Sequence, residues 1–310
     1  MTPFTSRSRD SVAALGEEKL IAAIRRWLGL ASPPAPYGIG DDCAVLPRSR
    51  ARQLLTVDPI VFGRHFDARV SPRAAGEKLL KRNLSDIAAM GGRPTAAVIS
   101  LLLDARVSRH WLEQFYRGLA AAARRYAVPI VGGDVGQAEH VVAATLTLLG
   151  ETTAGRALTR TGARRGDWIC VTGQLGGSLR SGHHHRFVPR LREGSWLAKQ
   201  RDVRAMMDLS DGLAKDLPAL TPTGTTAALD PNAVPRRRGS DLRAALGDGE
   251  DYELLFAFSG RADIKAFRQR WRKAFPQTRL SCLGRFVALN ARPADAIRLE
   301  DYRGYEHLRR

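Results

Sequence analysis

Long amphipathic helical segments alternate with short apolar runs along this chain, and that alternation limits the folds that it can adopt. Helical periodicity is found at residues 11–29, 72–91, 108–126 and 262–274. Strand-like runs bounded by turn residues are found at residues 53–58, 96–103, 128–133, 141–151, 168–173, 252–258 and 280–286. Because the alternation lacks the strict repeat of a barrel, we predict an α+β fold.

The length of the chain, 310 residues, is enough for about two domains that each bury a core. Strand-like periodicity lapses over the polar, glycine-bearing stretch 152–167 and then resumes. We therefore predict one domain over residues 1–151 and a second over residues 152–310. The tripeptide Leu-Ser-Asp occurs once in each half, at 84–86 and 209–211, which suggests related architecture in the two domains.

Composition argues against several other classes of protein. Hydrophobic residues make up 44% of the chain and charged residues 26%, a globular balance. The apolar runs fall short of the roughly 18 residues that span a bilayer, and the N-terminal residues lack the apolar core of a secretory signal. We therefore expect a cytoplasmic protein without a membrane segment. Cys43, Cys170 and Cys282 have no CxxC spacing, which argues against a disulfide framework or a thiolate zinc site.

The formal net charge of +18 raises the question of nucleic-acid binding, because lysine and arginine clusters bind phosphate backbones. The 49 basic residues are, however, spread along the whole chain. The sequence contains no zinc finger, basic zipper or aromatic ribonucleoprotein motif. We expect no specific nucleic-acid binding, and attraction of small phosphorylated substrates is a simpler explanation of the charge.

Acidic residues recur where an apolar run ends in a tight turn. They are Asp41, Asp42, Asp58, Asp86, Asp134, Asp208, Asp211, Asp248, Glu250 and Asp251. Any one of them has a structural alternative, because an Asp after a strand commonly forms a turn or caps a helix. As a set they indicate a hard divalent cation, since Mg²⁺ prefers a few carboxylates together with water and phosphate oxygens. The pattern therefore predicts phosphoryl chemistry at a metal site.

The common motifs for such chemistry are absent from the sequence. No glycine is followed by lysine, which excludes the Walker pattern, and there is no protein-kinase catalytic loop, DFG triplet or G-x-S-x-G nucleophile. The stretch GIGDDC at 38–43 lacks the third glycine of a dinucleotide-binding fingerprint. With these motifs excluded, the remaining interpretation is a nucleotide-dependent enzyme of a less familiar class.

Six motifs, in order, resemble those of thiamine-monophosphate kinases, members of the aminoimidazole ribonucleotide synthetase superfamily. They are GIGDDCAVL (38–46), NLSDIAAMGGRP (83–94), PIVGGD (129–134), GRALTRTGARRGDWICVTG (155–173), MDLSDGLAKDL (207–217) and GEDYELLFAF (249–258). The resemblance implies ATP-dependent phosphorylation of thiamine phosphate to thiamine diphosphate at a multi-Mg²⁺ site. It also implies an N-terminal ATP- and metal-binding domain, whose mixed or antiparallel sheet pairs in a homodimer, and a shortened C-terminal α/β sandwich domain.

The resemblance further implies residue roles. It places metal ligands at Asp42, Asp58, Asp86, Asp134, Asp208 and Asp211, with Thr56 and the backbone of Val57 near the same ions. ATP would contact Gly133, Arg160 and Ser210, and thiamine phosphate would contact His65, Glu250 and Tyr305. The catalytic group would be Asp211, Arg160 and Asp134.

The chemistry of the acceptor is compatible with these roles. A phosphate monoester has a second pKa of about 6, so its oxygen is already ionised near neutral pH and needs no general base. The obstacle is the repulsion between the acceptor phosphate and the ATP tail, which Mg²⁺ and an arginine can offset. We therefore expect direct in-line transfer.

Several residues keep alternative interpretations. His65 could be a packed residue of an amphipathic strand between Phe62 and Phe66, and Tyr305 could be a packing aromatic. The family usually has Ser-Thr-Asp where this chain has TVD at 56–58, so one hydroxyl ligand is missing. We expect the triple-histidine stretch GHHHRF at 182–187 to be a solvent-facing loop rather than a zinc site.

Two competing functions stay open at this point. One is a superfamily relative that uses ATP and Mg²⁺ on a different acceptor, as in selenophosphate synthesis or a carbamoyl dehydration. The other is a basic nucleic-acid-binding protein that has kept the fold without catalysis.

Overall fold

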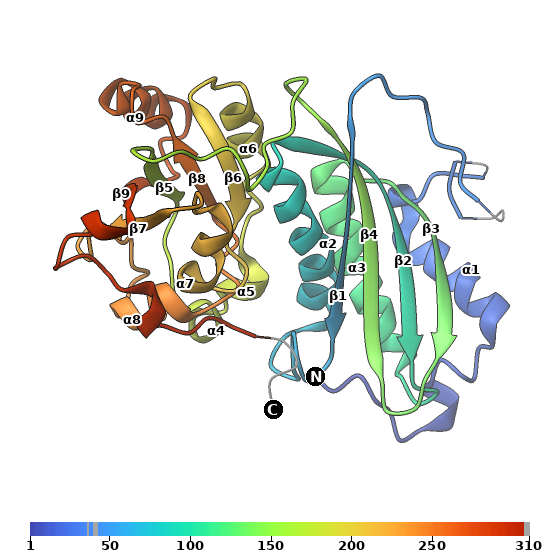
Figure 1. The fold of residues 1–310 in the computed structure, drawn as a ribbon. Helices are drawn as coiled ribbons and strands as arrows, with labels where there is room; N and C mark the ends of the chain where they lie inside the picture. Colours follow the sequence, from blue (N-terminus) through green and yellow to red (C-terminus); the bar gives the residue numbers. More distant parts are fainter. Residues whose placement is uncertain (36, 40–42, 307–310) are drawn as a thin grey trace. The chain divides into compact units, whose positions relative to one another are not determined.

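The computed structural model describes residues 1–35, 37–39 and 43–306 of the chain. They form two compact units, the first from residues 1–87 and 93–151 and the second from residues 88–92 and 152 onward (Figure 1). Asp41 and Asp42, two of the acids that the sequence analysis identified, lie outside the described residues. Within the described part, no helix is long and apolar enough to cross a membrane.

A mixed four-stranded sheet forms the frame of the first unit. Its strands are β1 (Gln53–Val61), β2 (Gly92–Leu103), β3 (Ile130–Gln137) and β4 (Val142–Thr152), in the order β1-β4-β2-β3. β1 and β4 are antiparallel, whereas β2 and β3 are parallel. Because a parallel pair needs a crossover connection, α3 (Arg109–Tyr126) lies between β2 and β3 in the sequence. The predicted mixed sheet is confirmed.

Two helices, α2 (Pro72–Ala89) and α3, cover one face of this sheet, and α1 (Glu17–Leu28) packs against α3 (Figure 1). Glycines allow α2 and α3 to approach closely. A Cβ atom at Gly76 would lie 2.0 Å from the carbonyl oxygen of Phe115, and one at Gly118 would lie 2.0 Å from that of Arg73. The two helices therefore pack backbone against backbone at this crossing.

The opposite face of the sheet carries apolar side chains that none of the described helices of the first unit covers. Leu55 and Val57 on β1 are 69% and 58% exposed, and Val98 and Leu102 on β2 are also exposed. These four residues define what we call the open face. On β4 the alternate residues Val142, Ala144, Leu146 and Leu148 are buried on the helix-covered side.

An antiparallel five-stranded sheet forms the second unit. Its strands are β5 (Trp168–Thr172), β6 (Val203–Asp208), β7 (Thr225–Leu229), β8 (Leu254–Phe258) and β9 (Leu280–Ala288), in the order β6-β8-β5-β9-β7. Its helices are α4 (Ser178–Ser181), α5 (His183–Arg186), α6 (Leu191–Ala198), α7 (Leu213–Asp216), α8 (Leu242–Gly247) and α9 (Ile264–Ala274). Short 3₁₀ helices complete the chain at Ser8–Asp10, Gly29–Ala31, Leu217–Leu220, Leu289–Ala291 and Leu299–Asp301.

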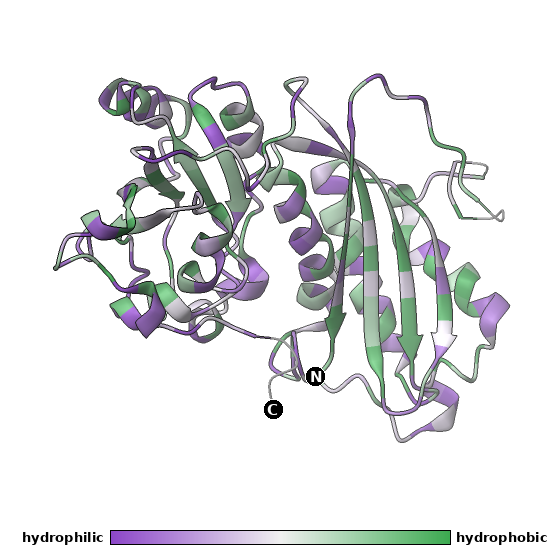
Figure 2. Ribbon diagram, viewed as in Figure 1, coloured by the Kyte–Doolittle hydropathy of each residue, from purple (hydrophilic) through white to green (hydrophobic). Residues whose placement is uncertain are grey.

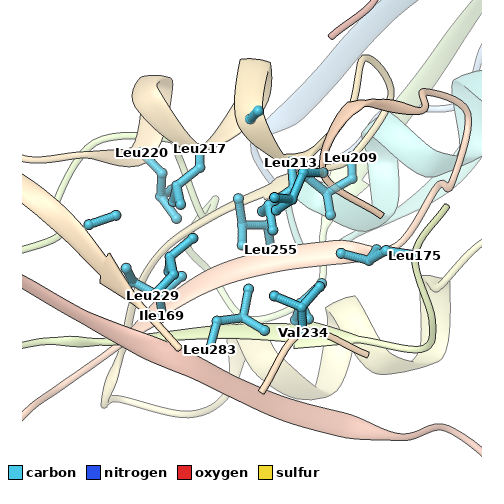
Figure 3. Close-up of a cluster of buried hydrophobic side chains, with 14 of the residues drawn as sticks. Ile169, Leu175, Leu209, Leu213, Leu217, Leu220, Leu229, Val234, Leu255 and Leu283 are labelled. Carbon is cyan, nitrogen blue, oxygen red and sulfur yellow. The ribbon is translucent and has the colours of Figure 1, made fainter. Parts of the chain in front are cut away.

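This second sheet is buried on both faces. Ile169, Leu255 and Leu283 face one core, which includes Leu213 and Leu217 from the α7 region (Figure 3). Cys170, Phe256 and Phe258 face the other core, which includes Phe267 and Trp271 of α9. Figure 2 shows that the central strands of this sheet are rich in apolar residues, as burial on both faces requires. Burial on both faces is typical of a sandwich, as we predicted for the C-terminal domain.

Cys170 and Cys282 face each other across β5 and β9, with their sulfur atoms 3.5 Å apart. Both are free thiols, and Cys43 is a free, exposed thiol as well. The structure therefore brings together two cysteines that are distant in the sequence without forming a disulfide.

The close crossing of α2 and α3 makes a prediction about stability. Gly76→Ala should lower the free energy of unfolding by about 1–3 kcal/mol, because the added methyl group has no space beside the Phe115 carbonyl. Arg124→Ala, at an exposed position of α3, should change it by less than about 0.5 kcal/mol. Urea unfolding measures both. Equal stability of Gly76→Ala and the wild type would show that the helices separate without cost.

Candidate functional site

The turn that follows β6 gathers the acidic residues of the MDLSDGLAKDL stretch. Asp208 ends the strand and is buried, and Ser210 and Asp211 follow in the turn. The carboxylate of Asp216 accepts hydrogen bonds from the backbone N–H groups of Ser210 and Asp211, each at 3.0 Å. Lys215 Nζ lies 2.7 Å from Asp211 Oδ2. The helix-cap alternative is not supported for Asp211, because the N-cap of α7 is Gly212 and α7 has no side-chain cap.

The loop that carries Glu250 is hydrogen-bonded to this turn. The N–H of Glu250 donates to the carbonyl oxygen of Ser210 at 2.7 Å, and the N–H of Tyr252 donates to that of Leu209 at 2.8 Å. The N–H of Tyr305 donates to the carbonyl oxygen of Asp211 at 2.9 Å. The structure therefore brings together four predicted site residues of the second unit, namely Ser210, Asp211, Glu250 and Tyr305.

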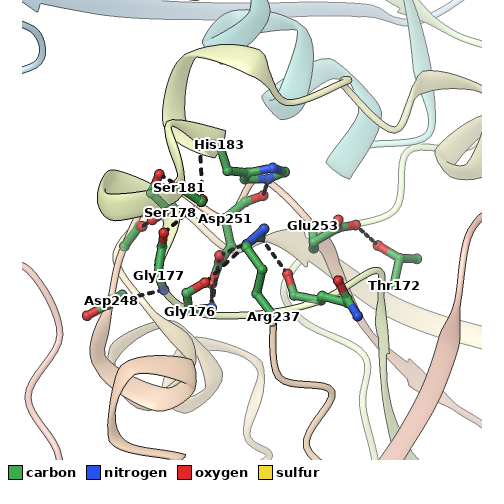
Figure 4. Close-up of polar contacts among 12 residues, drawn as sticks. Thr172, Gly176, Gly177, Ser178, Ser181, His183, Arg237, Asp248, Asp251 and Glu253 are labelled. Carbon is green, nitrogen blue, oxygen red and sulfur yellow. Dashed lines mark hydrogen bonds and ion pairs between the residues drawn. The ribbon is translucent and has the colours of Figure 1, made fainter. Parts of the chain in front are cut away.

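Asp251 anchors the same loop from its other side (Figure 4). Its carboxylate accepts from the N–H of Gly176 and lies 3.1 Å from the guanidinium of Arg237. Asp248 accepts from the N–H of Gly177 at 2.7 Å. Two acids of the GDGED stretch are thus used to hold the loop, whereas the Glu250 side chain between them keeps 20% exposure.

Two carboxyl groups in this region have displaced pKa values. Burial raises the pKa of Asp216 to about 7, and the charges of Asp208 and Asp211 add to that effect. Burial likewise raises the pKa of Asp251 to about 8, against the opposing influence of the Gly176 N–H bond and Arg237. Burial is therefore the main cause at both carboxyl groups, and at Asp216 the neighbouring carboxylates of the turn after β6 add to it.

Arg160, the arginine assigned to ATP, is exposed in the segment that precedes β5. That segment lies along β6, because the carbonyl oxygen of Thr159 accepts from the N–H of Met206 at 2.9 Å. The backbone position of Arg160 is thereby held beside the strand that ends in Asp208.

In the first unit, the TVD and LSD motifs meet across β1 and α2. Thr56 Oγ1 donates to Asp86 Oδ2 at 2.5 Å. Asp58 lies two residues further along β1 and is paired with Arg82 of α2, at 3.2 Å between Oδ1 and the guanidinium. Thr56, Asp58 and Asp86 therefore form one group on the helix-covered side of the sheet, whereas the Val57 side chain is exposed on the open face.

Asp134 belongs to a different edge of the same sheet. It lies on β3, whereas Asp58 lies on β1, and β4 and β2 separate the two strands. Three inter-strand steps place their backbones about 14 Å apart. Within one first unit, Asp58 and Asp134 therefore do not reach a common ion.

Gly133 and Asp134 line a cavity of about 480 Å³. Its wall combines apolar side chains, Ile24 of α1, Ile99 of β2 and Tyr116 of α3, with the charged Glu17 and Arg25 and the exposed Asp134. Gly133 has a structural role as well, because a Cβ there would lie 2.1 Å from the carbonyl oxygen of Ile99.

His65 lies in a turn that follows β1 and not in a strand, so the strand alternative in the sequence analysis is wrong. Its Nδ1 accepts from the N–H of Val61 at 3.0 Å, and its carbonyl oxygen accepts from Lys78 Nζ at 2.7 Å. Phe62 and Phe66 pack edge to face on either side of it in the sequence. These contacts give His65 a structural role in closing the turn.

The triple-histidine stretch is not the solvent-facing loop that we expected. It forms the short helix α5, and His184 is only 7% exposed. His184 Nδ1 lies 3.5 Å from Glu250 Oε2, and His183 Nε2 lies 3.0 Å from the carbonyl oxygen of Asp251. The expectation failed because the loop around Glu250, distant in the sequence, covers this helix.

Comparison with known proteins identifies the family. The model of the AIR synthase related protein, N-terminal domain, matches residues 40–152. The thiamine-monophosphate kinase of Salmonella typhimurium is 36% identical over 274 residues, which cover 78% of this chain and 82% of that protein. The chain belongs to the thiamine-monophosphate kinase family.

Solved structures of the family have the same fold. The thiamine-monophosphate kinase of Stenotrophomonas maltophilia K279a superimposes with a TM-score of 0.74 at 29% identity, covering 86% of this chain and 93% of that one. AaThiL complexed with AMPPCP and TMP superimposes with a TM-score of 0.71 at 29% identity, covering 98% and 99%.

Enzymes of this kinase family transfer phosphoryl groups, so we asked whether the residues present suit a divalent cation. Among residues 1–35, 37–39 and 43–306, no group of three or more histidine, cysteine, aspartate or glutamate side chains is arranged as a complete metal site. The donors of the second unit nevertheless fit a hard cation. Asp208 and Asp211 supply carboxylate oxygens, and both lie close enough to Asp216 for their charges to add to the rise of its pKa that burial causes.

Sequence reasoning missed three residues that the structure places at these candidate sites, one in the first unit and two in the second. Asp216 is the third aspartate of the stretch that the sequence analysis quoted, and its position five residues after Asp211 was a usable signal. Tyr116 has the helical spacing of a core residue, which hid its place on the cavity wall. Arg237 belongs to the basic run PRRRGSDLR at 235–243, and only the fold shows that it pairs with Asp251.

The raised pKa of Asp216 predicts a pH dependence of stability in Mg²⁺-free buffer. A carboxyl group whose pKa is higher in the folded than in the unfolded state keeps a proton that unfolding releases, so stability falls as pH rises between about 4 and 7. Asp216→Asn should flatten this slope, whereas Asp230→Asn, at an exposed position of the same unit, should not. Urea unfolding across this pH range tests it. An unchanged slope in Asp216→Asn would contradict the assignment.

Proposed function

We propose that the chain catalyses ATP-dependent phosphorylation of thiamine phosphate to thiamine diphosphate by direct in-line transfer. Family membership supports this reaction, and a related protein, AaThiL, has been solved with AMPPCP and TMP. The structural observation that carries the proposal is the hydrogen bonding between the turn after β6 and the loop of Glu250 in the second unit. There the residues assigned to ATP and metal, Ser210 and Asp211, are joined by backbone hydrogen bonds to those assigned to thiamine phosphate, Glu250 and Tyr305.

The acceptor explains why a site rich in carboxylates suits this reaction. The phosphate of thiamine phosphate is ionised near neutral pH, so the site must neutralise charge and position two phosphates rather than remove a proton. Mg²⁺ supplies that charge neutralisation when bound. We assign Asp208 and Asp211 as its ligands in the second unit. In the first unit we assign Asp42, Asp58, Asp86 and Asp134, with Thr56 and the Val57 backbone close by.

The nucleotide assignment uses the cavity beside β3. An apolar part of the wall that includes Ile24 and Tyr116 suits a flat base, and the polar part with Arg25 and the exposed Asp134 suits a phosphate chain with its metal. Gly133 lets the chain approach closely there. Arg160 and Ser210 are assigned to the phosphates.

A second copy of this chain is the partner that we propose for the open face. Leu55, Val57, Val98 and Leu102 form an exposed apolar set on one sheet, which monomeric proteins rarely leave uncovered. A two-fold pairing of open faces would bury the same residues from both copies.

The homodimer proposal predicts a change of mass on substitution. Leu55→Glu should convert the protein from dimer to monomer at micromolar concentration, because it buries a charge in the interface. Leu30→Glu makes the same chemical change at an exposed leucine outside the sheet and should leave the dimer intact. Light scattering coupled to size-exclusion chromatography measures the mass. A wild-type monomer, or a Leu55→Glu dimer, would reject this interface.

The catalytic proposal predicts products. With ATP and Mg²⁺, the protein should convert thiamine phosphate to thiamine diphosphate with release of ADP, and thiamine should be a poor acceptor. Asp211→Asn should lower kcat at least about 100-fold, because it removes one charge from the metal and phosphate site. Asp230→Asn is the matched control and should keep wild-type activity. Product analysis by liquid chromatography gives both results.

The outcomes separate the competing functions. A preference for thiamine over thiamine phosphate would reject the assignment, and turnover of ATP with another acceptor alone would favour the superfamily alternative. Tight binding of duplex DNA at low salt that is lost steeply as salt rises would favour the nucleic-acid alternative. Full activity of Asp211→Asn would remove that residue from the site.

A further inference from the structure

The triple-histidine segment packs on the loop that carries Glu250, and the function proposed above gives it no role. Its residues are His183, His184 and His185 of α5. His184 is the most buried of the three, and its Nε2 lies 3.1 Å from Nδ1 of His185. The imidazole of His184 is therefore fixed in orientation from the side away from Glu250.

The loop itself holds an unusual backbone conformation. Glu250 and Tyr252 have φ angles of 63° and 51°, in the left-handed region that side chains other than glycine seldom adopt. Such residues persist where the surrounding structure over-determines them, and they cluster at ligand sites. Here the bonds to Leu209 and Ser210 on one side, and that between His183 and the Asp251 carbonyl oxygen on the other, hold the loop (Figure 4).

Both oxygens of the Glu250 carboxylate have neighbours from this assembly. Oε1 accepts from the hydroxyl of Tyr252 at 3.3 Å, and Oε2 lies 3.5 Å from His184 Nδ1. The ring of Tyr252 stacks on Phe187, the residue that ends α5, with centroids 4.0 Å apart. The helix therefore sets the orientation of the carboxylate through two separate contacts, one by His184 and one by Phe187 through Tyr252.

We propose that His184 is a positioning residue that orients the Glu250 carboxylate for the acceptor and so sets the affinity for thiamine phosphate. The proposal rests on the function proposed above. A carboxylate held in one orientation, with part of its side chain exposed, suits a cationic or N–H-bearing heterocycle. The thiazolium and aminopyrimidine rings of thiamine phosphate have those properties. His184 contributes by holding Glu250, not by contacting the substrate.

Steady-state kinetics with matched variants test the proposal. His184→Ala should raise KM for thiamine phosphate about 10-fold, with KM for ATP and kcat changed less than about twofold, because only acceptor binding loses its preorganised group. His184→Asn should recover most of the affinity, since its amide nitrogen replaces Nδ1 toward Glu250. Arg186→Ala changes an exposed residue of the same helix and should behave as wild type.

A double-mutant cycle separates positioning from a general structural effect. Glu250→Gln alone should raise KM for thiamine phosphate, and adding His184→Ala to it should raise KM by less than about twofold further. If the double variant raised KM by the product of the two single-variant effects, the substitutions would be independent and the proposal would be overturned. An unchanged KM in a folded His184→Ala protein would overturn it as well. If His184→Ala fails to fold by circular dichroism, His184→Leu, which fills the space without a nitrogen toward Glu250, takes its place in both arms of the cycle, with the same expected and contradicting results.

Failure of this inference is distinguishable from failure of the proposed function. A wild-type protein that does not phosphorylate thiamine phosphate overturns the function. A wild-type protein that does so, together with a folded His184→Ala variant of unaltered KM, overturns only the role of His184.

Discussion

Backbone hydrogen bonding beyond the ends of β6 and β8 is the constraint on which the site of the second unit depends. The two strands are antiparallel neighbours, with Asp208 opposite Leu254. Pairing continues past the strand ends, through the bonds of Leu209 with Glu253 and Tyr252 and that of Ser210 with Glu250. A register shift of one residue between β6 and β8 would turn every side chain to the other face of this buried sheet. The register of the two strands therefore fixes the turn after β6 and the loop before β8 at the same time.

The same turn explains how closely spaced carboxylates are tolerated in the folded chain. Repulsion among Asp208, Asp211 and Asp216 is partly offset by Lys215 and by the two backbone N–H groups that donate to Asp216. Burial is the main cause of the raised pKa of Asp216, and the remaining repulsion from Asp208 and Asp211 adds to it. A cation that binds the folded state and not the unfolded chain would recover this stability, so the negative charge is both a cost to the metal-free protein and the source of metal affinity.

Periodicity was enough to predict the longer elements of the fold. All four predicted helices and all seven predicted strands are present, with ends displaced by a few residues. The strands β6 and β7 were missed, and for β6 the reason is physical. β6, with the sequence VRAMMD, is almost wholly buried, so it lacks the polar alternation of a half-exposed strand, and its Ala and Met residues favour strands weakly. Burial on both faces is a property of the assembled sheet and cannot be predicted from the sequence of one strand alone.

The sequence was enough to predict which residue types form the candidate site and in which order they occur along the chain. It was not enough to predict how their side chains are arranged in space. The pairing of Thr56 with Asp86 follows from neither motif alone, and the Arg82 partner of Asp58 was overlooked although it lies one helical turn before Asp86. The separation of Asp58 from Asp134 depends on the strand order of the sheet, in which β4 and β2 lie between β1 and β3. The order of the motifs in the sequence does not reveal this separation. Strand order is set by which apolar faces can be buried together. A carboxylate motif therefore predicts that a ligand binds, whereas the sheet decides which carboxylates can share it.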